Sequence, residues 1–543
     1  MRDPRQIVEA ILAGRGMTDA EEIAEYFSDS PRKTYDPFDL MNMREGVDLI
    51  LDTVREGGRI CIYGDYDADG VTSICILHQG LSHITDNLTW YIPSRFSEGY
   101  GVNMAAVEKL ASDGVDLIIT VDCGITSVEE VEKAKELGMK VLITDHHKPG
   151  EAIPDCLVID PKQDGEKYPN DNLAGCGVAF KILQGIQRAA DLPKTVVNDA
   201  LDLVGMGTVG DIVSLTDENR TIVKYGLRKL NEGLRPSIVA LSKAISLDEI
   251  TSENISFGLV PHINAAGRMG DAGDAVKLFL SEDPKVIDAQ VDKLIACNSE
   301  RRRVQDQAYE KALSLVTGEE DIIFLKVDGV HEGIAGIAAG KLKETFNRPV
   351  ILTTPTGEGI LKGTGRSIDG LDIHGLLQAH GDVFLKFGGH KKACGFSMRE
   401  EDFEGLKTAV EEDVKAIYAR DPSIIEGRLE FEMDILPSEI NIDLADELGK
   451  MEPFGEGNRA PVFLMKDVRI TYHRYMGGES QHVRFTAVRD DAGVQCVLFR
   501  RAAEFASLIE GGEPLDMTGT IRSQIWNGEK RVQFIVEEIR SGR

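Results

Sequence analysis

Hydrophobic and polar positions alternate in a regular way over residues 59–160. Four short apolar runs (RICIYG, DLIITV, KVLIT and CLVI) each end in polar residues, and SVEEVEKAKELG, between the second and third, has apolar side chains at helical spacing. Strands that alternate with helices predict βαβ units and a parallel sheet. Ligands bind such sheets beyond the carboxyl ends of the strands, where the polar residues gather here.

The pattern changes further along the chain. Residues 174–250 are predicted to be mostly helical, and residues 283–316 form one long helix whose uninterrupted length suggests a connector between lobes. A second β/α pattern follows, with DIIFLKV and PVILTT as strands around the helix GIAGIAAGKLKETF. From Pro461 onward five short alternating strands with Gly-containing turns predict a small closed barrel.

The predicted fold class is α/β: a parallel-sheet lobe joined by a long helix to a smaller α/β lobe, with a C-terminal β-barrel. The predicted domains are residues 1–220, 221–318, 319–425 and 426–543. A chain of 543 residues with 42% hydrophobic and 28% charged residues is long enough for several cores.

Targeting signals and cysteine usage indicate the compartment. No apolar run approaches the roughly 18 to 20 residues of a membrane span, and the start of the chain lacks the layout of a secretory signal. The eight cysteines are scattered singly without a CxxC pair, as expected for free thiols in a reducing compartment rather than a zinc ribbon. We therefore expect a soluble cytoplasmic protein without a membrane partner.

Three carboxylates follow the first predicted strand. Asp65, Asp67 and Asp69 occupy alternate positions of DYDADG, so they point to one side and would repel one another strongly without a cation. The alternatives are an acidic solvated turn or a calcium-type loop. That loop needs further oxygen ligands and a closing Glu, and residues 72–81 contain no acid.

Similar residues recur at the ends of the next strands. Asp122 ends the second strand, Asp145, His146 and His147 end the third, and Asp211 follows a helical stretch. Carboxylates suit Mg²⁺ and Mn²⁺, and an imidazole among them favours Mn²⁺. Two such cations can activate a water for in-line displacement at phosphorus, so these residues predict a dinuclear phosphoester hydrolase. The alternatives are that His147 only hydrogen-bonds the backbone and that Asp145 is a helix cap.

These motifs carry a family resemblance. DYDADG, VDCG, TDHH and GTVGD resemble, in order and spacing, the four motifs of the DHH phosphoesterase superfamily. NAAGRMGDAGDAV, HEGIAGIAAGKL, GTGRS and FGGHKKACGF resemble the signatures of its second lobe. With MEPFGEGNRAPVF before a barrel, the chain resembles the bacterial RecJ exonucleases from about residue 30 to its end.

The resemblance implies a DHH catalytic lobe, a DHHA1 substrate-binding lobe and a nucleic-acid-binding OB-fold. It implies 5′ to 3′ hydrolysis of single-stranded DNA with two Mn²⁺ or Mg²⁺ ions, in DNA repair and recombination. It also suggests a single-strand binding protein and a helicase as partners, and we expect a monomer.

Carried over residue by residue, the resemblance implies a set of metal ligands with Asp122 as the bridge. It implies that His147 is a further catalytic group, which either supports the ligands from behind or contacts phosphate. The smaller members of the superfamily have a His where this chain has Tyr63, so one cation has fewer protein ligands or uses Asp65. The implied ligands are Asp67, Asp69, Asp122, His146 and Asp211, with Asp65 as an additional ligand of one cation.

Hydrolysis of a threaded strand also needs donors to its phosphates. Candidates in Gly-rich contexts of the second lobe are Asn264, Arg268, His331, Arg366 and His390. His331 opens a helix whose N-terminus could receive a phosphate, or it is an exposed cap, and an Arg beside Gly is also typical of a turn that makes a salt bridge.

Further nucleic-acid contacts are predicted at Arg301 and Arg302 on the long helix, and at Tyr472, Arg474, Arg484 and Trp526 in the barrel. Aromatic and positively charged residues together are typical of stacking platforms for single strands. The alternatives are a solvated helix face for the arginines and core positions for many of the barrel residues.

The net charge of −30, from 61 basic and 91 acidic residues, argues at first against a polyanionic partner. Residues 459–543, however, hold 13 basic and 11 acidic residues, so the excess acid lies elsewhere, partly in the predicted metal ligands. Local basic strips can then guide the strand.

Two other functions remain open. A nanoRNase or cyclic-dinucleotide phosphodiesterase would use the same two lobes but would need no barrel. A non-catalytic single-strand-binding scaffold is the other alternative, and the five ligand positions argue against it.

Overall fold

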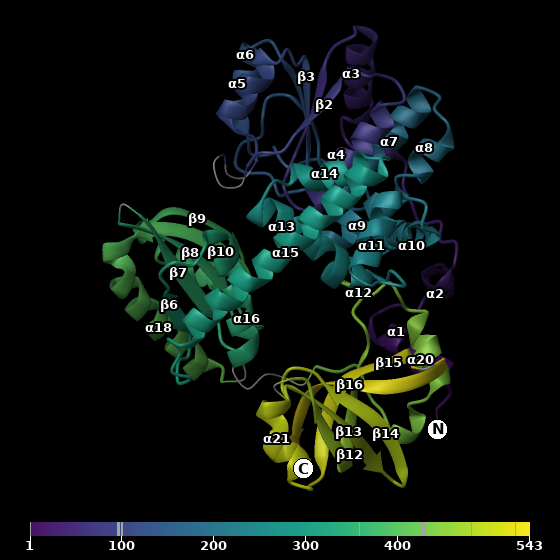
Figure 1. Cartoon of the computed structure of the whole chain (residues 1–543), viewed down its shortest axis with the longest axis vertical. Helices are drawn as coiled ribbons and strands as arrows, with labels where there is room; N and C mark the ends of the chain where they lie inside the picture. The colour runs from purple at the N-terminus through teal and green to yellow at the C-terminus, as the bar shows by residue number, and fades with distance from the viewer. Residues whose placement is uncertain are drawn as a thin grey trace. The chain divides into compact units, whose positions relative to one another are not determined.

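The computed structural model of the chain describes residues 2–94, 98, 101–357, 359–422, 424, 430–478, 480–526 and 528–542, except for the side chains of Glu332, Ile525 and Trp526. The chain divides into two compact units (Figure 1). The first comprises residues 1–260, 279–284 and 429–543, and the second comprises residues 261–278 and 285–428.

The N-terminal part of the first unit is an alternation of helices and short strands. Its elements are α1 (Pro4–Gly14), α2 (Ala20–Phe27), η1 (Pro37–Asp39), α3 (Met43–Arg55), β1 (Ile60–Gly64), α4 (Ala68–Leu81), β2 (Leu88–Tyr91), α5 (Met104–Ser112), β3 (Leu117–Val121), α6 (Val128–Glu136), β4 (Lys140–Thr144), β5 (Leu157–Ile159), α7 (Gly175–Ala189), α8 (Lys194–Asn198), α9 (Leu201–Gly210), α10 (Asp217–Glu232), α11 (Pro236–Ala244), α12 (Ser252–Asn254) and η2 (Ile255–Leu259).

The first five strands form the predicted parallel sheet, in the order β2-β1-β3-β4-β5. Successive side chains of a strand point to opposite faces. Cys61 and Tyr63 accordingly pack with apolar residues of α5 and α6, while α3, α4 and α7 contact the sheet elements from the other face. Strand β2 at the edge was not predicted.

The second unit has a mixed sheet in the order β6-β7-β8-β10-β9, with β6 and β7 parallel and the remaining pairs antiparallel. The long helix is continuous, as predicted. The elements from Val260 to Arg420 are α13 (Val260–Met269), α14 (Gly273–Leu280), α15 (Pro284–Leu313), β6 (Ile323–Lys326), α16 (Glu332–Phe346), β7 (Val350–Gly357), β8 (Ile360–Arg366), α17 (Ile373–Gln378), η3 (Gly381–Val383), β9 (Phe384–His390), β10 (Ala393–Arg399), η4 (Glu400–Asp402) and α18 (Phe403–Arg420).

The C-terminal strands form the predicted closed barrel. Its sheet has the order β11-β12-β13-β14-β16-β15, and pairing of β12 with β15 closes it. The elements are β11 (Met433–Asp434), η5 (Pro437–Glu439), α20 (Ile442–Gly449), β12 (Val462–Met476), β13 (His482–Arg489), β14 (Ala492–Leu498), α21 (Ala502–Glu510), β15 (Leu515–Trp526) and β16 (Glu529–Ser541).

The N-terminal helices belong to the core of this barrel domain. Ile7, Val8, Ile11 and Leu12 of α1 are buried together with Leu444 of α20 and with residues of the barrel strands. The segment 1–220 that the sequence assigned to one lobe therefore spans two cores, an arrangement that was not predicted.

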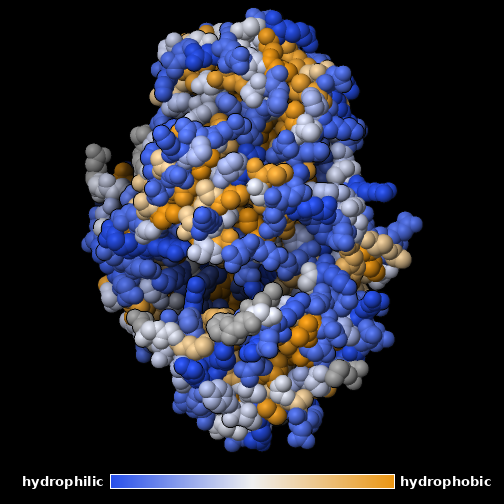
Figure 2. All heavy atoms as spheres, turned by 45° about the vertical axis from the view of Figure 1, so that its right-hand side comes forward, coloured by the Kyte–Doolittle hydropathy of each residue, from blue (hydrophilic) through white to orange (hydrophobic). Residues whose placement is uncertain are grey.

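The surface drawn in Figure 2 is covered mainly by hydrophilic residues, with smaller hydrophobic areas between them. Among the described residues, no helix has the length and apolar character needed to cross a membrane.

Candidate metal centre

The turn from β1 into α4 carries the first carboxylates. Asp67 is the N-cap of α4, and its Oδ1 accepts hydrogen bonds from the backbone N–H groups of Asp69 (2.9 Å) and Gly70 (3.1 Å). A carboxylate at this position satisfies backbone donors of the first helical turn and interacts favourably with the helix dipole. The cap fixes the direction in which the following Asp69 projects.

Asp69 reaches the N-terminus of a second helix. Its carboxylate accepts hydrogen bonds from the N–H groups of Gly175 (2.6 Å) and Cys176 (2.8 Å) at the start of α7. A Cβ at position 175 would lie 2.6 Å from the Cβ of Asp122, so the close approach of α7 requires glycine there. Asp69 and Asp122 are thereby brought to the same side of α7.

Asp122 follows β3 with a φ of 58°, in the left-handed region that few non-glycine residues adopt. Its side chain is buried, and its Oδ1 lies 3.0 Å from Nε2 of His146. Unusual backbone conformations of this kind cluster at functional sites.

The turn after β4 is organised by Asp145. Its Oδ1 accepts hydrogen bonds from the N–H groups of His146 (2.8 Å) and His147 (3.2 Å) and from Nδ1 of His147 (2.7 Å), and its Oδ2 accepts one from the N–H of Ile125 (3.0 Å). Burial raises the pKa of the Asp145 carboxyl, but the hydrogen bond and charge of His147 outweigh it and lower the pKa below its ordinary value. Asp145 thus acts as an ionised anchor for both histidines.

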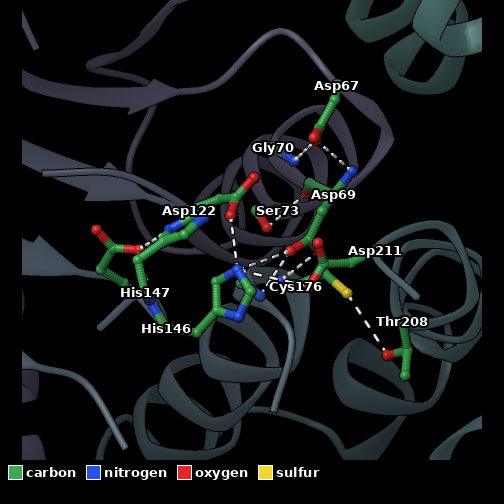
Figure 3. A network of polar contacts seen from close by, with 12 residues as sticks. Asp67, Asp69, Gly70, Ser73, Asp122, His146, His147, Cys176, Thr208 and Asp211 are labelled. Carbon is green, nitrogen blue, oxygen red and sulfur yellow. Dashed lines mark hydrogen bonds and ion pairs between the residues drawn. The ribbon is translucent and has the colours of Figure 1, made fainter. Parts of the chain in front are cut away.

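Asp211 caps the C-terminus of α9 and completes the cluster. Nε2 of His146 lies 3.6 Å from Oδ2 of Asp211 and 3.7 Å from Oδ2 of Asp69. Figure 3 shows His146 at the centre of these contacts, between Asp122 on one side and Asp69 and Asp211 on the other.

Three sets of potential ligand atoms result, and within each set the atoms lie within 4.8 Å of one another. Asp122 belongs to two of the sets and His146 to two, as expected of residues between two neighbouring cations. The sets are Asp65 with Asp67 and Asp122, Asp69 with His146 and Asp211, and Asp122 with His146 and His147.

The charges of this cluster fit divalent cations. Burial, followed by the charge of Asp67, raises the pKa of Asp69 to about 7, and burial together with the charge of Asp69 raises the pKa of Asp211 to about 7. Burial and the same neighbours raise the pKa of Asp122 well above its ordinary range. Burial lowers the pKa of His146, so its ring does not supply the missing positive charge. Oxygen ligands with one or two imidazoles are the donors that Mn²⁺ accepts.

Tyr63 stands where the resemblance implies a histidine in smaller members of the superfamily. It is fully buried, its hydroxyl donates to the carbonyl of Gly101 (3.0 Å), and its ring stacks on Tyr91. The ligand set of Asp65, Asp67 and Asp122 provides carboxylate oxygens without it.

In the second unit, three predicted phosphate contacts gather at the start of α16. His331 is the N-cap of α16, and its Nδ1 accepts a hydrogen bond from the N–H of Gly333 (3.1 Å). Nη1 of Arg268 donates to the carbonyl of Gly333 (3.2 Å), and a Cβ at position 336 would lie 2.6 Å from Nη2 of Arg366.

The other two candidates are placed by helix spacing and strand register. Asn264 precedes Arg268 by four residues on α13, so both share a helix face. Ala393 of β10 pairs with Arg366 of β8 on one side and with His390 of β9 on the other. Paired residues project to the same face of a sheet, so Arg366 and His390 lie in one row.

The predicted nucleic-acid contacts differ in exposure. Arg301 is half-buried and bonds to Asn298 and Gln305 of its own helix, whereas Arg302 is exposed. In the barrel Tyr472 pairs with Thr486 and Arg474 with Arg484. Tyr472, Arg474 and Arg484 are exposed and share the outer face, while the side chain of Trp526 lies outside the described residues.

Sequence reasoning missed the role of Asp145 and did not single out Asp160. Asp145 was considered only as a ligand or a cap, and its role as an anchor depends on bonds that no spacing reveals. Asp160, directly after β5, is fully buried. Burial raises the pKa of its carboxyl to about 7, although a hydrogen bond from the backbone N–H of Lys162 acts in the opposite direction. Its position directly after a predicted strand could have marked Asp160 as a candidate site residue.

Three family models match the chain. The model of the DHH family, N-terminal domain, matches residues 59–208, that of the DHHA1 domain matches residues 319–416, and that of the RecJ OB domain matches residues 431–538.

Several curated proteins with similar sequences carry the name single-stranded-DNA-specific exonuclease RecJ. The Bacillus subtilis protein is 34% identical over 98% of this chain and 67% of its own length. The Thermus thermophilus protein is 33% identical over 92% of this chain and 71% of its own length. The Escherichia coli protein is 32% identical over 84% of this chain and 82% of its own length.

Solved structures agree with these similarities. The crystal structure of RecJ in complex with Mn²⁺ from Thermus thermophilus superposes with a TM-score of 0.83 at 29% identity, over 98% of this chain and 76% of that chain. A crystal structure of exonuclease RecJ bound to manganese superposes with a TM-score of 0.62 at 34% identity, over 72% of this chain and 97% of that chain.

Proposed function

The chain belongs to the RecJ family of single-stranded-DNA-specific exonucleases, and from this premise we propose that it degrades single-stranded DNA in the 5′ to 3′ direction, in repair and recombination. It is a metal-dependent hydrolase of phosphodiester bonds. The observation that carries the mechanism is the convergence of three ligand sets, joined by Asp122 and His146, at the carboxyl edge of the parallel sheet.

The enzyme uses Mn²⁺ or Mg²⁺. In our proposal Asp67, Asp69, Asp122, His146 and Asp211 hold two ions, with Asp122 between them and Asp65 as an additional ligand. When bound, such a pair supplies an activated water and stabilises the attacking and leaving oxygens of an in-line displacement.

The remaining polar groups position these ligands and the substrate. Asp67 and the start of α7 fix Asp69, and Asp145 orients both histidines. Burial lowers the pKa of His147, but the hydrogen bond and charge of Asp145 outweigh it and raise the pKa to about 9. The ring of His147 is 45% exposed and protonated at neutral pH, so it can donate to a phosphate oxygen.

Substrate binding is assigned to two further surfaces. Arg268, His331, Arg366, Asn264 and His390 of the second unit contact the phosphates of the terminal nucleotides in our proposal. The exposed outer face of β12 and β13 binds the strand by stacking on Tyr472 and by charge from Arg474 and Arg484.

The direct test is digestion of end-labelled single-stranded oligonucleotides with Mn²⁺, comparing 5′-blocked with 3′-blocked substrates and DNA with RNA. We expect the 3′-blocked DNA to be degraded and the 5′-blocked DNA to persist. An Asp122→Ala variant with unchanged circular dichroism is the control for contaminating nucleases. Intact single-stranded DNA would overturn the proposal.

The same assay separates the two alternatives. A strong preference for dinucleotides over long strands would indicate a nanoRNase or cyclic-dinucleotide phosphodiesterase, but the barrel favours long strands. A scaffold without catalysis would bind single strands and fail to bind Mn²⁺ in calorimetry.

We also propose that the protein acts as a monomer in the cytoplasm, with a single-strand binding protein and a helicase as partners. All eight cysteines are free, which supports a reducing compartment. Sedimentation of the purified protein and co-purification with a single-strand binding protein test these points.

A further inference from the structure

The segment MEPFGEGN, residues 451–458 and here called the glycine loop, leads into the barrel strand β12 but binds the catalytic lobe of the same unit. The N–H of Leu215 donates to the carbonyl of Glu456 (2.8 Å), and Oγ of Ser252 donates to the carbonyl of Phe454 (2.7 Å). Nη2 of Arg220 donates to the carbonyl of Glu452 (2.9 Å). Three donors of the catalytic lobe therefore bind backbone carbonyls of the glycine loop.

The glycine loop is itself held in one conformation. Asn458 is 4% exposed, and its Nδ2 donates to the carbonyls of Met451 (2.9 Å) and Pro453 (2.8 Å). Its Oδ1 accepts hydrogen bonds from the hydroxyl of Tyr26 (2.9 Å) and from Nη1 of Arg15 (3.1 Å). A buried amide with both ends satisfied fixes the backbone around it.

The segment that this loop binds begins directly after Asp211. Upstream, the N–H of Asp211 donates to the carbonyl of Gly207 in α9 (2.9 Å). Downstream, the carbonyl of Ser214 accepts from Nδ2 of Asn219 (3.0 Å), and Leu215 is 2% exposed. Asp211 thus lies between α9 on one side and residues 212–216, held by the glycine loop, on the other.

Two glycines make the close approach of the loop to this segment possible. Gly457 has a φ of +70°, and a Cβ there would lie 2.1 Å from Oγ and 3.1 Å from Cβ of Ser214. A Cβ at Gly455 would lie 2.6 Å from Cδ1 of Leu215. A side chain at position 457 would therefore have to displace the side chain of Ser214, three residues after Asp211.

We propose that the glycine loop is a positioning element of the catalytic centre. By fixing residues 212–216 it holds Asp211 where its carboxylate completes the ligand set with Asp69 and His146. The inference rests on the proposed function, in which Asp211 is a metal ligand. It assigns to the barrel domain an effect on metal affinity and turnover, in addition to any binding of DNA.

The test compares Gly457→Ala with Gly512→Ala in the full chain. Gly512 has nearly the same φ, +72°, and open space where a Cβ would stand, so its variant carries the backbone strain without contact to Ser214. Mn²⁺ affinity is measured by calorimetry, and kcat and KM are measured with a single-stranded oligonucleotide. Thermal unfolding is followed in EDTA.

We expect Gly457→Ala to bind Mn²⁺ about 10-fold more weakly and to lose at least about 10-fold in kcat, with KM changed less than about threefold. Gly512→Ala should resemble the wild type in Mn²⁺ affinity and kcat. Adding Ser214→Ala removes the Oγ at 2.1 Å and should restore most of the Mn²⁺ affinity, because the two positions are coupled.

A purely structural role of the loop would lower the melting temperature and leave the Mn²⁺ affinity of the folded protein unchanged. Equal Mn²⁺ affinities for Gly457→Ala and Gly512→Ala, or no rescue by Ser214→Ala, overturn the inference. If Gly457→Ala is insoluble, Gly455→Ala is judged by the same Mn²⁺ criterion. Failure of the wild type to degrade single-stranded DNA would instead contradict the proposed function.

Discussion

In the metal centre, Nε2 of His146 lies 3.0 Å from Oδ1 of Asp122. This imidazole faces the carboxylates of three strand- and helix-end residues, but burial lowers its pKa, so it is neutral and does not balance their charge. The folded chain therefore holds a group of mutually repelling carboxylates that bound divalent cations would stabilise.

Asp122→Asn should stabilise the metal-free protein while abolishing activity. The substitution removes a carboxyl whose pKa is raised well above its ordinary range by burial and by the charge of Asp69, and Asn tolerates the φ of 58° at this position. We expect a gain of about 1 kcal/mol in unfolding free energy in EDTA at pH 8, and at least about 100-fold less activity with Mn²⁺.

Thermal unfolding in EDTA and digestion of single-stranded DNA check both parts. Asp86→Asn, at an exposed position of the same lobe, is the matched control for removal of one charge. A lower melting temperature for Asp122→Asn than for Asp86→Asn would show that the carboxylates do not destabilise the metal-free fold.

Cation binding should release protons near neutral pH. Burial and neighbouring charges raise the pKa of Asp69 and of Asp211 to about 7, so both carry protons below that pH, and ligation requires the ionised form. We expect about one to two protons released per protein at pH 6.5 from Asp69 and Asp211, and fewer from these two groups as the pH rises above 7. Calorimetry in two buffers of different ionisation enthalpy measures this number, and zero release at pH 6.5 contradicts the assignment.

The raised pKa values of Asp69 and Asp211 also determine how the stability of the metal-free protein changes with pH. Because the folded-state pKa values lie above the ordinary value, the two carboxyls contribute stability below about pH 4 that is lost as the pH rises through 7. The metal-free protein should therefore lose stability from these groups between about pH 4 and about pH 7, and Mn²⁺ should stabilise it most above pH 7.

The residues that the sequence did predict are those whose position follows from strand periodicity. Asp122 and His146 stand at the ends of apolar runs, so the parallel sheet brings them together without further information. The bonds of Asp69 to Gly175 and Cys176 join positions 106 and 107 residues apart, and no local pattern encodes them.

Other features were out of reach for the same reason. The amphipathic pattern of α1 marks Ile7 and Leu12 as buried, but does not say that the covering surface is a barrel more than 400 residues later in the chain. The motif MEPFGEGN carries part of the family resemblance, whereas the need for glycine at 457 depends on the position of Ser214.

Asp145→Asn should disorganise the turn that carries both histidines. The amide keeps only one acceptor oxygen where the carboxylate accepts four hydrogen bonds, so the Nδ1 contact of His147 is weakened. We expect activity and Mn²⁺ affinity to fall about 10- to 100-fold.

The positioning role is visible in the titration of His147, whose pKa should fall from about 9 toward its ordinary value when measured by NMR. Asp155→Asn, at an exposed carboxylate before β5, serves as the control. Full activity in Asp145→Asn would mean that Asp145 does not orient His147 for catalysis.

Tyr472→Ala should weaken the binding of long single strands without affecting the chemical step. Tyr472 is 58% exposed on the outer face of β12, two residues before the exposed Arg474, which pairs with Arg484. Stacking of one base on an aromatic ring contributes about 1–3 kcal/mol, so KM for long single strands should rise about 5- to 150-fold. Turnover of di- and trinucleotides should stay unchanged, because Tyr472 is not among the residues that hold the metal ions in our proposal.

Tyr475→Phe is the matched control, because Tyr475 lies on the same strand, projects to the other face and bonds to Glu510. Arg484→Ala should raise KM as well and reduce the dependence of binding on salt, since one phosphate contact is lost. If Tyr472→Ala slowed short and long substrates equally, the outer face of β12 would have to be regarded as structural, and the single strand would need another path from the barrel to the carboxylates.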